Sequence, residues 1–207
     1  MKTLTKYLNE RLVIIFPSQV DEKLVINKDY NDPYTYAPTS FDELRKIIED
    51  RYNKLGAGTK QKPIDFNDVD VRNIDSFYDN NINIGIFAGT KFKYIDVSDW
   101  DVSNVKDMNY MFYGCAQLKS VGGLSKWDVS KVEHMTSMFE YCEQLKSVGD
   151  LSNWNVSKVE NMNAMFYGCI QLKSVGDLSN WNVLNVKYMF NMFKKSGITN
   201  IPKWYRG

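Results

Sequence analysis

Three cysteines and one histidine are the residues of this chain whose side chains most readily bind metals or act as nucleophiles. Cys115, Cys142 and Cys169 follow one another at intervals of 27 residues. An odd number of cysteines without C-x-x-C spacing is a poor signature of a zinc site or of disulfides. His134 is the only histidine, and no nucleophile recurs beside it. We therefore predict no catalytic residue, no metal site and no cofactor.

The spacing of the cysteines shows that they are one position of an internal repeat, and several other positions recur at the same step. The segment LKSVG also recurs, starting at Leu118, Leu145 and Leu172. We expect these columns to form the core of stacked copies, with Cys and Met acting as apolar filler. Each indole N–H is expected to donate to a loop carbonyl of the adjacent copy. The recurring columns are Trp100, Trp127, Trp154 and Trp181; Met108, Met135, Met162 and Met189; Met111, Met138, Met165 and Met192; and Phe112, Phe139, Phe166 and Phe193.

Each copy contains one helix-like and one strand-like pattern. Ser130 and Glu133 match a capping box, which predicts a helix start. Gly114 and Gly168 stand where a helix would end. The segment LKSV predicts a short strand before a glycine. Each copy is thus predicted to be a short helix, a short strand and a return loop. The apolar residues at helical spacing are Val132, Met135, Met138, Phe139 and Cys142.

The repeats occupy residues 65–207, with copies starting near residues 65, 96, 123, 150 and 177. The first copy, DFNDVDVRNIDSF from Asp65, aligns with DVSDWDVSNVKDM from Asp96 but carries a six-residue insertion. In the last copy Ser196 replaces the cysteine. Degenerate end copies are expected, because end copies face solvent on one side.

Residues 1–64 have a different pattern and are predicted to form an α/β cap over the first copy; an independent docking domain is the alternative. The pattern near Leu4 to Leu12 predicts an amphipathic helix, and LVIIF with KLVIN predicts a hairpin. A further helix should begin at Ser40, which forms a capping box with Glu43, and end before the Gly- and Pro-containing segment 56–63. Its apolar face comprises Phe41, Leu44, Ile47, Ile48 and Tyr52.

The recurring W-[DN]-V-S-x-V-x-x-M-x-x-M-F-x-x-C resembles the repeat of BspA-like leucine-rich repeat proteins, also known as mycoplasma-type surface repeats and found in gut phage genomes. The resemblance covers roughly residues 65–207. It implies an α/β leucine-rich-repeat-like solenoid of about five 27-residue helix–strand units that binds or adheres to proteins without catalysis. Because no signal peptide or lipid-attachment cysteine is seen near Met1, a cytoplasmic or phage-associated location is favoured over the family's usual cell surface.

The composition narrows the classes of partner. Lys and Arg number 26 against 25 Asp and Glu, so nucleic-acid binding is not expected. No run approaches the ~18 apolar residues of a membrane span. We predict a protein partner, with self-association also possible. The alternatives are a structural component of a phage particle or self-assembling array, and an enzyme with its site in the N-terminal segment. The latter is disfavoured because residues 1–64 contain no His, Cys or phosphate-binding glycine loop.

Two sets of columns are candidate binding surfaces. Lys119, Lys146 and Lys173 should stack on the strands at ~4.8 Å spacing, offset by Asp150 and Asp177. They form either a solvated face that opposes edge-to-edge aggregation or a basic strip for an acidic partner or anionic glycan. The second set varies between copies and is expected to be exposed, with its tyrosines as protein anchors. It comprises Tyr110, Ser137 and Ala164, and Tyr113, Glu140 and Tyr167; the predicted anchors are Tyr110, Tyr113 and Tyr167.

Overall fold

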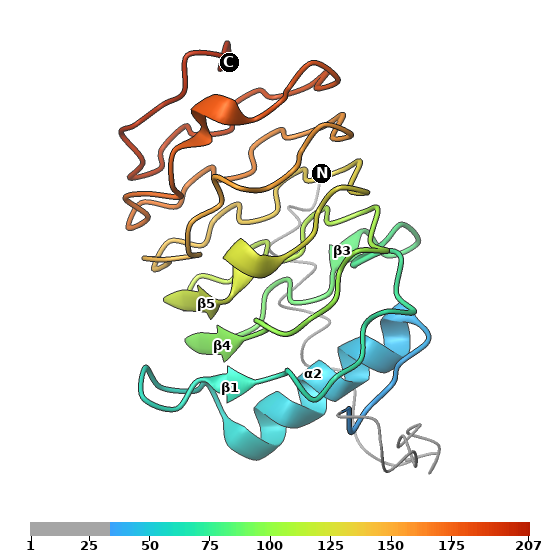
Figure 1. Ribbon diagram of the computed structural model, residues 1–207. Helices are drawn as coiled ribbons and strands as arrows, with labels where there is room; N and C mark the ends of the chain where they lie inside the picture. Colours follow the sequence, from blue (N-terminus) through green and yellow to red (C-terminus); the bar gives the residue numbers. More distant parts are fainter. Residues whose placement is uncertain (1–33) are drawn as a thin grey trace.

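The computed structural model describes residues 34–207, which form a stack of coils with one helix at the end nearer the N-terminus (Figure 1). The helix predicted near Leu4 to Leu12 and the predicted hairpin lie outside the described residues. The architecture is mixed α/β with little regular secondary structure. In order, the elements are α2 (Phe41–Leu55), β1 (Ile64–Asp65), β2 (Tyr78–Asp79), β3 (Ile84–Gly85), β4 (Tyr94–Asp96), β5 (Ser120–Gly122) and two 3-10 turns (Leu124–Lys126 and Leu178–Asn180).

Helix α2 forms where the sequence predicts it. The Ser40 hydroxyl accepts the Glu43 N–H at 3.2 Å, and the Glu43 carboxylate reaches back to the Thr39 N–H at 2.7 Å. The helix buries Leu44, Ile47 and Ile48 and ends at Gly56, which has a φ of 74°. The capping residues and the apolar face of this helix are therefore confirmed.

Helix α2 packs on the first coil through both apolar and polar contacts. The Arg45 guanidinium donates to the carbonyls of Gly85 (3.0 Å) and Ile86 (2.8 Å). Arg51 pairs with the Asp68 carboxylate at 2.6 Å and lies 4.9 Å from the centroid of the Phe66 ring. The helix thus occupies part of the coil edge that another copy would otherwise cover.

Strands β1, β4 and β5 form a small parallel sheet along one flank of the stack (Figure 1). Ile95 of β4 pairs with Ile64 of β1 on one side and with Val121 of β5 on the other. The ladder continues as a single bridge between Ser120 and Ser147. Within residues 34–207 no strand is formed at the next LKSV segment, so the predicted strand weakens along the stack.

The helix predicted in each repeat is wrong: the segment forms turns. Two kinds of hydrogen bond alternate along it. The Ser137 N–H donates across to the Asn163 carbonyl of the next coil at 2.8 Å, whereas the Glu140 N–H donates to the Ser137 carbonyl of its own coil at 3.2 Å. An α-helix would instead bond every N–H four residues back within the segment. Half of the donors are therefore used to hold the coils together.

The backbone conformation explains why the apolar spacing wrongly predicted a helix in each repeat. Two residues of this segment in each copy, four positions apart, adopt a left-handed conformation, which interrupts a right-handed helix. The φ values at the first position are 55° at Tyr110, 55° at Ser137, 54° at Ala164 and 58° at Asn191. Tight turns also place residues three apart on the same side, so the apolar spacing suits turns as well as a helix. The supposed capping serine, Ser130, has its N–H bonded to the Asp128 carboxylate at 3.0 Å, which makes a turn and no helix cap.

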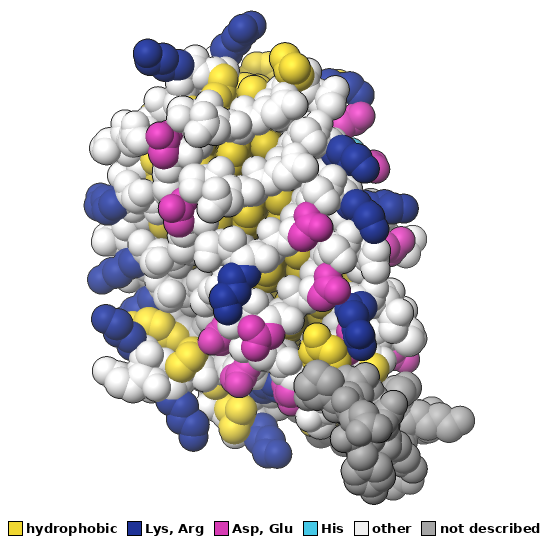
Figure 2. Space-filling view, in the orientation of Figure 1, with side chains coloured by type: hydrophobic (Ala, Val, Ile, Leu, Met, Phe, Trp, Pro, Cys, Tyr) yellow, Lys and Arg dark blue, Asp and Glu magenta, His cyan; other side chains and the backbone are white. Residues whose placement is uncertain are grey.

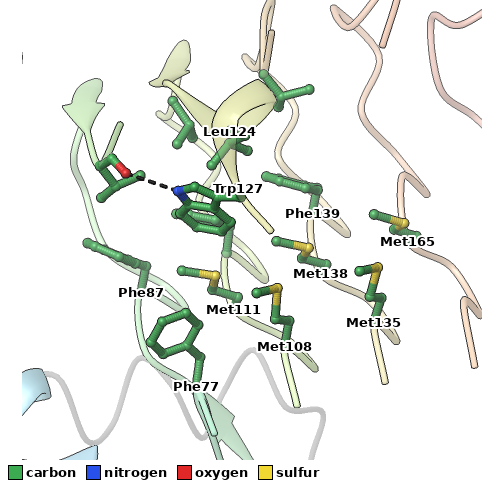
Figure 3. Close-up of a cluster of buried hydrophobic side chains, with 14 of the residues drawn as sticks. Phe77, Phe87, Met108, Met111, Leu124, Trp127, Met135, Met138, Phe139 and Met165 are labelled. Atoms are coloured by element: carbon green, nitrogen blue, oxygen red, sulfur yellow. Dashed lines mark hydrogen bonds between the residues drawn. The ribbon is translucent and has the colours of Figure 1, made fainter. Parts of the chain in front are cut away.

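The tryptophans join the coils through their indole N–H groups, as predicted. Trp127 Nε1 donates to the Val97 carbonyl at 3.0 Å (Figure 3), and Trp154 Nε1 donates to the Leu124 carbonyl at 2.8 Å. In each case the acceptor lies in the preceding coil. The column therefore combines apolar burial with a satisfied polar atom at every step.

The methionine, phenylalanine and cysteine columns fill a single continuous core, except for Met189 of the outermost coil, which is half-buried. Figure 3 shows methionines of successive coils aligned beside the phenylalanines. Phe112 and Phe139 stack with centroids 5.1 Å apart. All three cysteines are free and buried, and Cys142 Sγ donates to the Phe112 carbonyl at 3.0 Å. Burial raises the pKa of Cys169 to about 12, so it is a thiol at neutral pH. The core role predicted for the cysteines is confirmed.

The insertion in the first copy forms a hairpin at the edge of its coil. Strands β2 and β3 pair antiparallel, with Tyr78 opposite Gly85. The Phe77 N–H bonds to the Asp107 carbonyl and the Phe87 N–H to the Met111 carbonyl, both in the next coil. The six extra residues therefore leave the stacking of this coil on the next one unchanged.

Candidate binding surface

The two predicted sets of columns lie on different parts of each coil. Lys119 directly precedes β5, and Lys146 and Lys173 occupy the same position in the next two copies, on one flank. The tyrosines lie on the turns that follow each methionine column, on the side of β3 (Figure 1). The lysine surface and the tyrosine surface differ in geometry and in electrostatics.

Five tyrosine rings from successive coils make one continuous strip, which we call the tyrosine strip. Neighbouring rings contact one another with centroids 5.4–5.9 Å apart, mostly edge to face. Lys195 Nζ lies 5.4 Å from the centroid of the last ring. The strip comprises Tyr78, Tyr110, Tyr113, Tyr141 and Tyr167.

The repeat itself places these rings. Tyr141 occupies the column that holds Gly114 and Gly168 in the neighbouring copies, and all three have positive φ (61°, 66° and 73°). A Cβ at Gly168 would lie 3.1 Å from the Tyr141 ring, so the glycine leaves room for the ring of the preceding coil. The sequence did hold a signal for Tyr141, because a tyrosine there replaces the glycine of the neighbouring copies. Tyr78 lies in the insertion, where no column marks it.

An acidic side chain lies among the rings. Glu140 is half-buried, and burial raises the pKa of its carboxyl, although the hydrogen bond from the Ser137 hydroxyl opposes the shift. Burial, together with the nearby Glu140 charge, raises the pKa of Tyr113 to about 12. The Tyr113 phenol is therefore neutral at physiological pH and can donate a hydrogen bond.

The prediction that both variable columns are exposed is wrong in part. The Ser137 residue is only 4% exposed, because its left-handed backbone turns the side chain toward Glu140. Tyr110, Tyr113 and Tyr167 are half-buried, the first two against each other and Tyr167 against Tyr141. Tyr141, at 41%, is the exposed ring of the strip.

The lysine column borders a shallow groove of about 440 Å³. Lys119 and Lys146 line it together with Lys60, whereas Lys173 does not. Within residues 34–207 the lysines of the column make no salt bridge. Basic side chains project along the left edge of the molecule in Figure 2, the flank on which β4 and β5 lie.

The carboxylates expected to offset these lysines have another role. Asp150 accepts the Ser152 N–H at 2.9 Å, and Asp177 accepts the Ser179 N–H at 3.0 Å. These hydrogen bonds lower the pKa of both carboxyls. They fix the turns that follow the strands, and the lysine charges are left to solvent.

His134 belongs to a structural ladder. It forms parallel bridges with Asp107 of the preceding coil and Asn161 of the next. In the described part of the chain, no three His, Cys, Asp or Glu side chains converge as a metal site would require. No helix of that part is long and apolar enough to span a membrane.

Comparison with known proteins places the repeats in a family. Residues 65–204 match the family described as "Mycoplasma protein of unknown function, DUF285". The chain belongs to this family. The match confirms the prediction that the repeats of this chain resemble the mycoplasma-type, BspA-like repeat. The family description carries no function, so the function of these repeats must be argued from their surfaces.

One solved structure is similar over part of the chain. It is a leucine-rich repeat protein from Eubacterium ventriosum, 18% identical, with a TM-score of 0.36; the match covers 58% of this chain and 35% of that one. This chain therefore spans about a third of that protein's length. No curated protein matches the sequence.

Proposed function

We propose that this DUF285 chain is a non-catalytic protein-binding module, and that its repeats form a leucine-rich-repeat-like solenoid of about five units. The observation that carries the proposal is the tyrosine strip, in which each ring touches the next from Tyr78 to Tyr167. The repeated columns of Cys, Met, Phe and Trp are used in the core, so the variable surface between them is what remains for recognition.

The physical argument rests on pre-ordering of the strip. Half-buried rings packed against one another lose little conformational freedom on binding. Each ring offers an apolar face and a hydroxyl, which is the combination found in protein-binding hot spots. Tyr141 is the most exposed of the five and lies between Tyr113 and Tyr167. It is therefore the natural centre of a contact.

The test uses peptides selected from a displayed random library on the immobilised protein. Affinities of the selected peptides are then measured for the wild type and for the Tyr141→Ala/Tyr167→Ala variant. We expect a loss of about tenfold or more. The matched comparison is Lys119→Ser/Lys146→Ser/Lys173→Ser, which should bind these peptides as the wild type does. Equal affinity of the selected peptides for the wild type and the double-tyrosine variant would refute the proposal that the tyrosine strip is the binding surface.

The lysine column supports a second candidate, a basic strip for an acidic protein or anionic glycan. It is favoured by the unpaired lysines along the groove. The probes are polyglutamate and heparin, measured against the three-lysine variant. Replacement of all three by Ser should leave folding intact and weaken binding several-fold, more so at low salt. Equal binding would leave the lysines as a solvated face.

A structural role in a phage particle or a self-assembling array is the third candidate. It is favoured by the apolar side chains exposed in the outermost coil, such as Leu184 at 90% and Phe190 at 65%. Light scattering over a range of concentrations separates the candidates, because a monomeric binder keeps a constant mass whereas an assembling protein grows with concentration.

A further inference from the structure

The coil formed by residues 181–193 has an apolar outer edge where the inner coils are polar. Leu184 stands in the column of Ser157, and Phe190 stands in the column of Asn163. Tyr188 likewise replaces Asn161. Leu184 is 90% exposed, Phe190 65% and Tyr188 51%. End copies of repeat proteins normally present polar residues to solvent, so this substitution pattern is the reverse of a polar cap.

The same edge presents backbone groups that every inner coil uses for stacking. The Met162 N–H donates to the Tyr188 carbonyl at 2.7 Å, and the Lys187 N–H donates to the Glu160 carbonyl at 2.8 Å. One copy on, the Met189 and Asn191 N–H groups and the Lys187 carbonyl have no hydrogen-bond partner among residues 34–207. These groups form an open template for one more extended segment.

The tail of the chain closes only part of this coil. Trp204 stacks on Trp181 with centroids 6.2 Å apart, and its Nε1 donates to the Leu178 carbonyl at 2.7 Å. Tyr205 packs edge-on against Phe193. The Trp and Phe columns are therefore covered, and Gly207 lies beside the Met189 carbonyl. The side chains of Leu184, Tyr188 and Phe190 stay exposed.

The positive charge of this end of the stack favours an acidic partner. Residues 178–207 contain five basic side chains and no Asp or Glu. In Figure 2, Lys, Arg and hydrophobic side chains occupy this end of the molecule, at the top. A second copy docked through the same end would bring like charges together, which disfavours it. The basic residues are Lys187, Lys194, Lys195, Lys203 and Arg206.

We infer that the edge from Leu184 to Asn191 is a docking site for an extended segment of a partner protein, in which apolar and acidic residues alternate. The segment adds to the stack as a further coil edge. It accepts the Met189 and Asn191 N–H groups, donates to the Lys187 carbonyl and covers Leu184, Tyr188 and Phe190. Main-chain hydrogen bonds hold it in place, and the apolar and charged side chains select it. The tyrosine strip plays no part in this inference.

The probe is a synthetic peptide with the sequence of residues 157–168, carrying Lys158→Glu to make it acidic. Inside the stack this segment accepts the Met135 and Ser137 N–H groups of the preceding coil, which lie in the columns of Met189 and Asn191. Its partner peptide keeps Lys158 and carries Glu160→Lys, so the apolar pattern is identical and the charge is reversed. With the full chain at low salt, we expect the acidic peptide to bind about tenfold tighter, and the difference to shrink at high salt.

The deciding variant is Leu184→Ser/Tyr188→Asn/Phe190→Asn, which installs the residues that an inner copy carries and so should fold. We expect it to bind the acidic peptide at least about tenfold more weakly than the wild type. The matched control is Leu55→Ser, which removes a side chain 55% exposed at the opposite end and should change nothing.

Three results would overturn the inference: no binding of the acidic peptide to the wild type, equal binding to the triple variant, or no preference between the two peptides. Sedimentation of the wild type adds a fourth. A dimer that the triple variant abolishes would show that this edge is occupied by a second copy.

Discussion

At each end of the stack the outermost coil has backbone groups that no further coil bonds, and the two ends differ in how these groups are treated. At the end covered by α2, the Gly85 and Ile86 carbonyls are bonded by the Arg45 guanidinium. At the other end, the Met189 and Asn191 N–H groups lack hydrogen-bond partners within residues 34–207. A helix can close a coil edge with a few side-chain donors and an apolar face. The α2 end is therefore closed by contacts that stabilise the stack, whereas the other end leaves backbone N–H groups available to a partner.

The largest expected effect tests whether α2 stabilises the stack. Ile48 is fully buried on the inner face of α2, whereas Leu184 is 90% exposed at the other end of the stack. We expect Ile48→Ala to lower the free energy of unfolding by about 2–5 kcal/mol. Leu184→Ala should change it by less than about 0.5 kcal/mol. Urea denaturation measures both; equal losses would show that the ends do not differ in this way.

The next effect concerns the polar part of the closed end. Replacement of Arg45 by Met keeps the length of the side chain but leaves the Gly85 and Ile86 carbonyls without their donor. We expect a loss of about 1–3 kcal/mol in the same denaturation experiment. Lys187→Met is the comparison, because it removes a cation from an exposed ion pair with Glu160, and solvent screening makes the expected loss much smaller.

A smaller effect distinguishes inner coils from the outermost one through backbone strain. Ala164 holds a φ of 54°, where glycine costs less, whereas Asn191 fills the same column at 58° and tolerates it better. Ala164→Gly should raise stability by up to about 1 kcal/mol, and Asn191→Gly by less. A melting temperature that falls for Ala164→Gly would contradict the left-handed conformation at this position.

The smallest effect is a pH dependence that compares two glutamates. Burial raises the pKa of Glu140, so its protonated form favours the fold and this contribution is lost as pH rises through the raised pKa. Glu160 has the opposite sign: a hydrogen bond from Lys187 lowers its pKa, so its contribution is lost as pH falls. Glu140→Gln should therefore increase stability above the pKa of Glu140, and Glu160→Gln should decrease it slightly at neutral pH. Thermal unfolding between pH 4 and 8 measures both differences.

The sequence predicted the parts of the fold that depend on residue type and spacing along the chain. The Ser40 cap and the apolar face from Leu44 to Ile48 define α2 through local contacts alone. The Trp and Cys columns were assigned to the core because they repeat, and their indole and thiol donors bond to the preceding coil as repetition requires. For the binding surface, Tyr110, Tyr113 and Tyr167 were found, whereas Tyr141 and Tyr78 were not.

By itself, the sequence determined the repeat period, the core columns and helix α2, because burial of apolar side chains and capping depend on residues close in the chain. Only the tertiary structure decided that the Met-containing segment of each copy forms turns. Spacing of three suits both structures, and the choice depends on carbonyls that the next coil supplies. The tyrosine strip was likewise decided by stacking, because its rings become neighbours only when the coils lie side by side.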